Sequence, residues 1–241
     1  MLNETNSLGQ RVGVAIADWV RPPVPTRDAM ERRFCNLEPL NPEVHGQSLF
    51  DCNQLDTAGR NWTYLPYGPF AAFEDYGKWL REYTQKDDPL FFAIVAKGSG
   101  RAVGVASYLR IDPGHGSIEV GGLNFSPLLQ NTPAATEAMY LMMERAFRLG
   151  YRRYEWKCNA LNAESRRAAQ RFGFSFEGVF RQAAVYKGRN RDTAWYSVIN
   201  REWPALHEAF LTWLDPSNFD ATGRQLIALS SLTQPLVHQH G

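Results

Sequence analysis

The sequence has few cysteines, almost no net charge and no long apolar run. Its 241 residues include three cysteines, Cys35, Cys52 and Cys158, which lie far apart and form no C-x-x-C pair. This number and spacing indicate neither a disulfide framework nor a zinc site. Lys and Arg total 26 against 25 Asp and Glu, so the net charge of +1 offers no field to hold a polyanion. Nucleic acid is therefore not an expected partner.

Targeting and metal signals are missing as well. No run approaches the roughly 18 apolar residues of a membrane span. Residues 1–10 are polar where a signal peptide needs a basic start and an apolar stretch. The five histidines show no metal-binding spacing. We therefore expect a cytoplasmic protein with reduced thiols, no membrane partner and no metal, and the sequence is compatible with a homodimer.

Motifs for several common activities are also absent. The chain contains no G-x-x-x-x-G-K-[ST] phosphate loop, no G-x-G-x-x-G dinucleotide fingerprint and no G-x-S-x-G nucleophile elbow. The sequence therefore gives no support for nucleotide hydrolysis, NAD chemistry or the usual serine-hydrolase chemistry.

What is present predicts an α+β protein. We expect an extended arm over 1–30, because Pro22, Pro23 and Pro25 forbid helix there, then a domain over 31–200, and a helical extension with a loose tail over 201–241. Apolar periodicity predicts helices before Gly59 and over 71–84, 133–149, 163–172 and 207–214. It predicts strands over 33–40, 91–96, 102–110, 117–125, 153–158, 174–179, 183–187 and 193–199. This order favours a mixed, mostly antiparallel twisted sheet flanked by helices.

Two strand-to-helix junctions stand out. The strand 117–125 carries Gly121–Gly122, which predicts a bulge or a close backbone approach, and Thr132 then caps a helix that begins at Pro133. A second helix begins after Asn162 and carries Arg166 and Arg167. Free amides and the helix dipole make such starts suitable for phosphate, although most capped helices bind nothing and adjacent arginines often form a solvated face.

Three segments together resemble the GNAT acetyltransferases. They are SIEVGGLNF at 117–125, Q-x-x-x-x-A at 130–135, and N-A-E-S followed by G-F and E-G over 162–178. The resemblance covers about residues 30–200 and is greatest to the branch that contains the ribosomal-protein N-terminal acetyltransferases. It implies a GNAT-like fold and direct transfer of an acetyl group from acetyl-CoA, as co-substrate, to a primary amine. That amine is a protein N-terminus or a small molecule, and a non-catalytic acyl-CoA-binding module is the alternative.

The resemblance also implies a set of acetyl-CoA contacts. Pyrophosphate is expected on the amides over 131–136, pantetheine along 123–125, and further contacts from the second junction. The residues expected to bind acetyl-CoA are Leu123, Asn124, Phe125, Gln130, Asn131, Thr132, Ala134, Ala135, Thr136, Asn162, Ser165 and Arg166. Two departures keep the non-catalytic alternative open. Pro133 replaces a common glycine and lacks an N–H, and Ala169 stands where many relatives carry a tyrosine that protonates the leaving thiolate.

Acetyl transfer needs a base, an oxyanion site and a partner for the thiolate. Alternation along the strand places Glu119 on the opposite face from Ile118 and Val120, so we expect it to be the base, directly or through water. The alternative is a cross-strand ion pair. Backbone N–H groups over 123–125 are the expected oxyanion site. Ser165 is the expected thiolate partner, with an ordinary first-turn residue as the alternative.

The acceptor pocket is expected among aromatic residues, as the resembled family uses its first helices and the loop between them. The candidates are Trp62, Tyr64, Tyr67, Phe70 and, on a strand, Tyr108, with core packing as the alternative for each. Four late basic residues, Arg181, Lys187, Arg189 and Arg191, are interpreted as a solvated turn, with the 3′-phosphate of CoA as the alternative.

Overall fold

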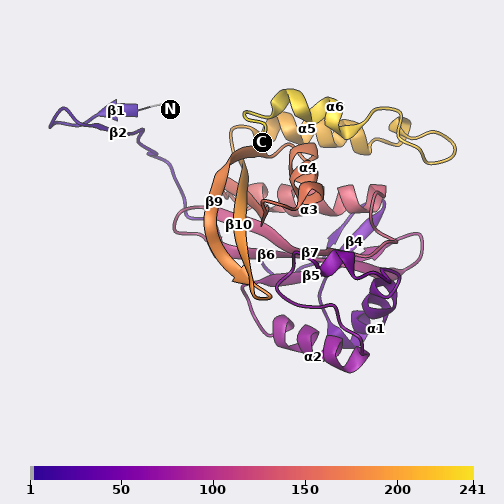
Figure 1. The fold of residues 1–241 in the computed structure, drawn as a ribbon. Helices are drawn as coiled ribbons and strands as arrows, with labels where there is room; N and C mark the ends of the chain where they lie inside the picture. The colour runs from indigo at the N-terminus through magenta and orange to yellow at the C-terminus, as the bar shows by residue number, and fades with distance from the viewer. Residues whose placement is uncertain (1–2) are drawn as a thin grey trace.

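An eight-stranded sheet with the order β3-β4-β5-β6-β7-β8-β10-β9 organises the computed structural model, which describes residues 3–241 (Figure 1). Its strands are β3 (Met30–Glu31), β4 (Cys35–Pro39), β5 (Leu90–Ala96), β6 (Arg101–Asp112), β7 (Ser117–Phe125), β8 (Arg153–Asn159), β9 (Ser175–Tyr186) and β10 (Arg189–Ile199). All neighbours are antiparallel except β7 and β8, which run parallel. The predicted mixed, mostly antiparallel α+β fold is confirmed.

Helices cover both faces of the sheet. On one face lie α1 (Pro42–Asn53) and α2 (Phe73–Thr84), joined by a segment with the short 3₁₀ helix η1 (Arg60–Trp62). On the other lie α3 (Pro133–Arg148), α4 (Ala163–Arg171), α5 (Trp203–Leu214) and α6 (Leu229–Thr233), with the 3₁₀ helices η2 (Pro216–Asn218) and η3 (Gln234–Leu236) beside them (Figure 1). No helix among residues 3–241 is long and apolar enough to span a membrane.

The start of α3 lies where its sequence signals predict. Thr132 Oγ1 accepts a hydrogen bond from the Ala135 amide at 3.2 Å, and Pro133 occupies the first turn. The end of the sheet differs from the prediction. The strands expected over 174–179 and 183–187 form the single long strand β9, and the strand expected over 193–199 begins earlier, as β10. Gln182 adopts φ 52° at an irregularity of the β9–β10 pairing, but β9 continues through it. The Gln182 amide donates to Asp192 Oδ1 at 2.7 Å, so it is not left unpaired.

The two ends of the chain also differ from expectation. Residues 3–13 form a hairpin of β1 (Asn3–Thr5) and β2 (Arg11–Gly13) that projects from the body (Figure 1), whereas a simple extended arm was predicted over 1–30. The end of the arm nearest the domain does lie on it, since Arg145 donates to the carbonyls of Thr26 and Asp28, each at 2.7 Å. The tail is attached at β9, because the Gln239 carbonyl accepts from the Phe176 amide at 2.9 Å.

The feature that positions the site is a separation of β7 from β8. Their pairing runs from Ser117 opposite Arg153 to Val120 opposite Trp156, although both strands continue beyond it. The predicted irregularity at the glycine pair is confirmed: the register against β6 shifts there, and a Cβ on Gly122 would lie 2.8 Å from Phe91 Cζ. Past Val120, the edge of β7 therefore faces an opening instead of a strand.

Candidate active site

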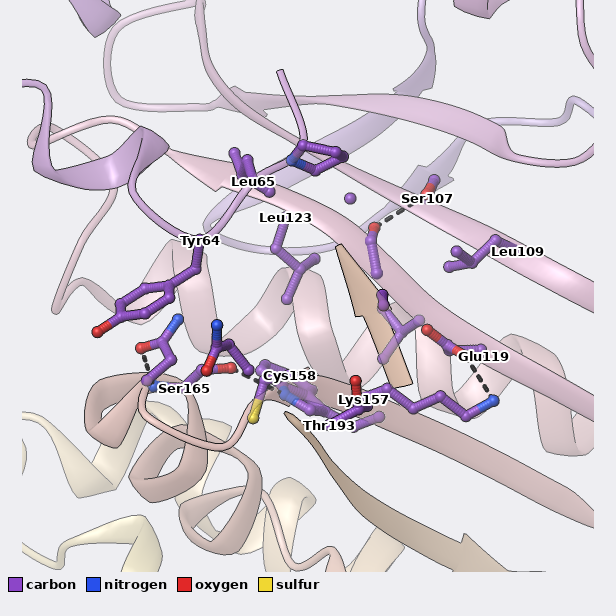
Figure 2. Close-up of a pocket in the computed structure, with 18 of the residues that line it drawn as sticks. Tyr64, Leu65, Ser107, Leu109, Glu119, Leu123, Lys157, Cys158, Ser165 and Thr193 are labelled. Atoms are coloured by element: carbon purple, nitrogen blue, oxygen red, sulfur yellow. Dashed lines mark hydrogen bonds and ion pairs between the residues drawn. The ribbon is translucent and has the colours of Figure 1, made fainter. Parts of the chain in front are cut away.

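A cavity of about 530 Å³ occupies the opening between β7 and β8 (Figure 2). Its walls come from β7 and β8, the segment between α1 and α2, the β9–β10 hairpin and the first turn of α4. The residues used below are Tyr64, Tyr67, Arg110, Glu119, Leu123, Lys157, Cys158, Asn162, Ser165, Phe180, Arg191 and Trp195. A cavity of this size suits a small molecule.

A chain of ion pairs crosses one side of the cavity. The Glu119 carboxylate is 3% exposed, and both of its oxygens accept from Arg110 Nη1 at 2.7 Å. Lys157 Nζ lies 2.9 Å from Glu119 Oε2 (Figure 2). The same Nζ lies 2.7 Å from Glu155 Oε2. The chain continues through Arg153, which pairs with Glu155 at 2.6 Å. Glu119, Glu155 and Lys157 are buried, whereas the Arg110 side chain is 56% exposed, and each charge has a partner of opposite sign.

The environment of Glu119 sets its protonation. Burial raises the pKa of the Glu119 carboxyl above its ordinary value, and the Arg110 and Lys157 cations oppose this rise. The cross-strand ion pair that was the alternative interpretation is therefore present in the structure. Because the carboxylate also borders the cavity, its role as a base remains a proposal.

Ser165 lies where the cavity meets α4. Asn162 caps the helix by accepting the Ser165 amide at 3.1 Å, and Ser165 Oγ accepts from Trp156 Nε1 at 3.0 Å. A hydrogen bond from Ser165 lowers the pKa of the neighbouring Cys158 thiol, although burial, the larger effect, raises it. Ser165 thus presents a hydroxyl to a sulfur atom at the cavity wall.

The Arg166 guanidinium forms two hydrogen bonds with neighbouring groups of the protein. Its Nε donates to Tyr196 Oη at 3.1 Å and its Nη1 to the Ala160 carbonyl at 3.2 Å. These bonds tie the half-buried Arg166 side chain to the β8–α4 turn and to β10, so it is not part of a freely solvated face, and its contact with acetyl-CoA stays a prediction.

The junction between β7 and α3 is shaped by its polar side chains. Gln130 Nε2 donates to the Phe125 carbonyl at 2.8 Å, and Asn131 adopts φ 60°. Within residues 3–241, the amides of Asn131 and Ala134 donate to no protein acceptor, whereas those of Thr132 and Ala135 do. Two of the expected phosphate donors are therefore available.

Two further residues at this junction differ from expectation. Arg171, which the sequence reasoning missed, donates through Nη1 to Thr136 Oγ1 at 3.1 Å beside the start of α3. Burial lowers the pKa of its guanidinium, and it forms no ion pair within residues 3–241. The Asn124 side chain is buried, and neither of its polar atoms has a hydrogen-bond partner within residues 3–241, so a contact between Asn124 and pantetheine would use the backbone and stays a prediction.

The aromatic candidates divide into two groups. Tyr64 and Tyr67 line the cavity, whereas Trp62 is 4% exposed and packs its ring edge-on against Phe70 in the core. Tyr108 is fully buried on the opposite face of the sheet, where its hydroxyl donates to the Met142 carbonyl at 2.6 Å. Alternation along β6 explains this correction, because the neighbours Ser107 and Leu109 face the cavity.

The β9–β10 hairpin contributes a wall that the sequence did not reveal. Arg191, Thr193 and Trp195 alternate along β10 and face the cavity. The Trp195 ring stacks on Phe180 with centroids 4.5 Å apart, and Lys157 Nζ lies 3.7 Å from the indole centroid. Alternating residues are visible in the sequence, but nothing in it shows that this hairpin borders the opening.

Two hydrogen bonds hold the wall in place. Lys187 Nζ, in the turn of the hairpin, donates to the Trp62 carbonyl at 2.8 Å. Tyr64 Oη donates to the Leu161 carbonyl at 3.3 Å, which joins the α1–α2 segment to the β8–α4 turn. Lys187 is exposed in the hairpin turn, as the solvated-turn interpretation expects, but it also makes this structural contact. No group of three or more His, Cys, Asp or Glu residues suited to a metal occurs within residues 3–241.

Comparisons with known proteins agree with this geometry. A family model described as an acetyltransferase (GNAT) domain matches residues 35–175. A GCN5-related N-acetyltransferase structure from Brucella melitensis is 47% identical, with a TM-score of 0.88 over 90% of this chain and 99% of that one. A probable GNAT-family acetyltransferase from Chromobacterium violaceum is 41% identical, with a TM-score of 0.75 over 80% and 96%.

A more distant structure bears on the predicted branch. An acetyltransferase from Salmonella typhimurium that modifies the N-terminal serine of ribosomal protein L7/L12 is 21% identical, with a TM-score of 0.60 over 70% of this chain and 96% of that one. At this identity the likeness shows the fold alone. No curated protein matched the sequence.

Proposed function

Because the chain belongs to the GNAT acetyltransferase family, we propose that it transfers the acetyl group of acetyl-CoA to a primary amine by direct attack. The observation that carries this proposal is the cavity at the separated strands, which joins an aromatic chamber on one side of the sheet to the start of α4 on the other. The family uses acetyl-CoA as co-substrate. The ribosomal-protein branch rests on a distant likeness only, so that acceptor is not carried over to this chain.

The residues at the two junctions fit the phosphorylated end of acetyl-CoA. The amides of Asn131 and Ala134 are free to donate at the start of α3, where the helix dipole favours an anion. Arg171 adds an unpaired positive charge beside Thr136. This charge compensates for Pro133, which removes one N–H from the turn.

The thioester end fits the opening itself. We place pantetheine along the unpaired edge of β7 at Leu123, with Asn162 and Ser165 beside the sulfur. Backbone N–H groups on this edge are suited to the oxyanion of the tetrahedral intermediate. The Ser165 hydroxyl, already close to one sulfur atom, would then donate to the departing CoA thiolate.

Glu119 is the proposed proton acceptor. The amine nitrogen must lose a proton before or as its bond to the acetyl carbon forms, and the C–S bond breaks as CoA leaves. A carboxylate with a raised pKa at the cavity wall can take that proton directly or through water. Arg110 and Lys157 hold this carboxylate in one orientation.

The test is release of free thiol from acetyl-CoA, measured against a panel of small amines and peptides with free N-termini. We expect amine-dependent thiol release above the rate without amine, and CoA binding in calorimetry. CoA binding without thiol release for any amine would support the acyl-CoA-binding alternative. No detectable heat with CoA on folded protein would contradict both.

A further inference from the structure

We propose that the acceptor is a small amine that also carries a carboxylate on an apolar or aromatic body, that is, an amino-acid-like zwitterion. This inference rests on the proposed acetyl transfer and names the substrate class of the same cavity. Three features support it: the charge of the cavity wall, buried donors that lack acceptors, and the hydrogen bonds that join the segments around the aromatic side of the cavity, here called the chamber.

The charge of the wall disfavours polycations. Its cationic side chains are Arg110, Lys157 and Arg191, whereas Glu119 is its one carboxylate among the described residues. Glu119 is already shared by Arg110 and Lys157. A second ammonium on the substrate would be repelled by this positive charge, whereas a carboxylate would be attracted. Polyamines and aminosugars with several amines therefore fit poorly.

Three buried donors at this wall lack acceptors. Tyr67 Oη, Trp195 Nε1 and Arg191 Nε are buried and have no hydrogen-bond partner within residues 3–241. The indole and guanidinium nitrogens can only donate. An unpaired buried donor is unfavourable, so a ligand that supplies oxygen atoms there gains affinity. The thioester offers one carbonyl oxygen, whereas a carboxylate adds two acceptors.

The remaining wall suits an apolar body of limited size. The rings of Tyr64, Tyr67, Phe180 and Trp195 border the chamber. The bonds from Lys187 to the Trp62 carbonyl and from Tyr64 to the Leu161 carbonyl join the segments that surround it. An extended peptide would require these contacts to open, whereas a single amino acid would not. The structure therefore favours the small zwitterion over a protein N-terminus.

The experiment compares L-phenylalanine, L-phenylalanine amide and 2-phenylethylamine as acceptors at equal concentration of acetyl-CoA. The three share the ring and the amine but differ in the carboxylate. We expect kcat/KM for the amino acid to exceed that for the amide and for the amine at least tenfold. Equal values, or a preference for peptides, would overturn the inference while leaving acetyl transfer intact.

Two pairs of variants locate the recognition. Arg191→Gln should reduce the ratio of kcat/KM between the amino acid and its amide to near one, whereas Arg189→Gln, on the exposed start of β10, should keep it. Trp195→Phe keeps an aromatic ring but removes the unpaired indole N–H, and it should lower the ratio severalfold. Its control is Trp79→Phe, which removes an equally unpaired indole N–H outside the cavity. A ratio unchanged in both Arg191→Gln and Trp195→Phe would contradict the proposed recognition.

Binding separates this inference from the proposed function. Calorimetry of the enzyme saturated with CoA measures acceptor recognition without turnover. Tighter binding of L-phenylalanine than of its amide supports the inference even where thiol release fails, and equal binding overturns it.

Discussion

The two faces of β7 and β8 are equally buried but carry different chemistry. Ile118 and Tyr154 face α3 and belong to the apolar core, with 0% exposure. On the other face, Glu119 is 3% exposed, Glu155 is 9% exposed and the Lys157 side chain is 7% exposed. These three residues form ion pairs with one another. Burial alone therefore does not identify the core of this protein. The position of a residue along the strand does identify it, because successive side chains point to opposite faces of the sheet.

The largest effect is expected where the charged face meets the cavity. Glu119→Gln removes the proposed base, so kcat should fall by a factor on the order of 10² to 10⁴, the usual contribution of general base catalysis. Affinity for CoA, measured by calorimetry, should change little, because Glu119 lies away from the phosphate junction.

Glu155→Gln is the matched control. It removes a second carboxylate from the same Lys157 ammonium, but Glu155 does not line the cavity. Each variant breaks a buried ion pair, so we expect each to lose up to about 3–5 kcal/mol of unfolding free energy. Equal losses of kcat in the two variants would show that Glu119 acts through structure only.

The pH profile sharpens the same comparison. A base must be deprotonated, so kcat/KM should rise with pH through the pKa of Glu119. Burial raises that pKa, and the rise should therefore lie above pH about 4.3, the ordinary value for glutamate. Glu119→Gln should abolish this limb, whereas Glu155→Gln should keep it. A limb that persists in Glu119→Gln would assign the base elsewhere.

Ser165→Ala tests the α4 side of the opening. Loss of a hydrogen bond to the departing thiolate should lower kcat by roughly 10- to 100-fold, because hydrogen bonds to charged groups contribute about 1.5–3 kcal/mol. The matched control is Ser126→Ala, which removes a buried hydroxyl that has no partner and lies outside the cavity. Single-turnover kinetics separates this step from binding, and equal rates in both variants would remove Ser165 from the mechanism.

The core face should affect stability without affecting turnover. Tyr108→Phe removes the hydrogen bond to the Met142 carbonyl, at an expected cost of about 1 kcal/mol of unfolding free energy. Tyr154→Phe removes a buried hydroxyl without a partner and should cost nothing or stabilise the fold. Urea denaturation measures both. A large loss of kcat in folded Tyr108→Phe would mean that this face also contributes to the site.

The smallest effect concerns the exposed end of the ion-pair chain. The pKa of Glu177 is lowered in the folded state, and the main cause is its hydrogen bonding with Arg153. A lowered pKa stabilises the fold above the unfolded pKa, and this stabilisation is lost as pH falls through the folded pKa. The urea midpoint of the wild type should thus exceed that of Glu177→Gln at pH 7, and the two should converge below pH about 4. A constant difference at every pH would show that Glu177 acts by packing.

Local signals in the sequence predicted much of the fold. Thr132 and Pro133 fixed the start of α3, because capping and proline act within one turn. Gly122 predicted an irregular, closely approached strand, which the contact with Phe91 explains. The merging of the last strands was missed, since the Gln182 amide is satisfied by Asp192, ten residues away.

The site was predicted less completely. Parity placed Glu119 on the face opposite to the core, but its partners Arg110 and Lys157 come from neighbouring strands whose register the sequence did not give. Tyr108 was placed on the wrong face because its strand was not aligned with β7. Arg171 and Trp195 were not identified, since an arginine in a helix and a tryptophan in a strand carry no signal of their own.

The sequence by itself determined the order of helices and strands, the capped starts of α3 and α4, and the resemblance to the acetyltransferases, because these depend on short-range periodicity and motif spacing. Only the tertiary structure decided which residues share the cavity. The separation of β7 from β8, the wall that the β9–β10 hairpin adds and the balance of charge around Glu119 all arise from contacts between distant segments, and hydrogen bonding and burial at those contacts are properties of the folded chain.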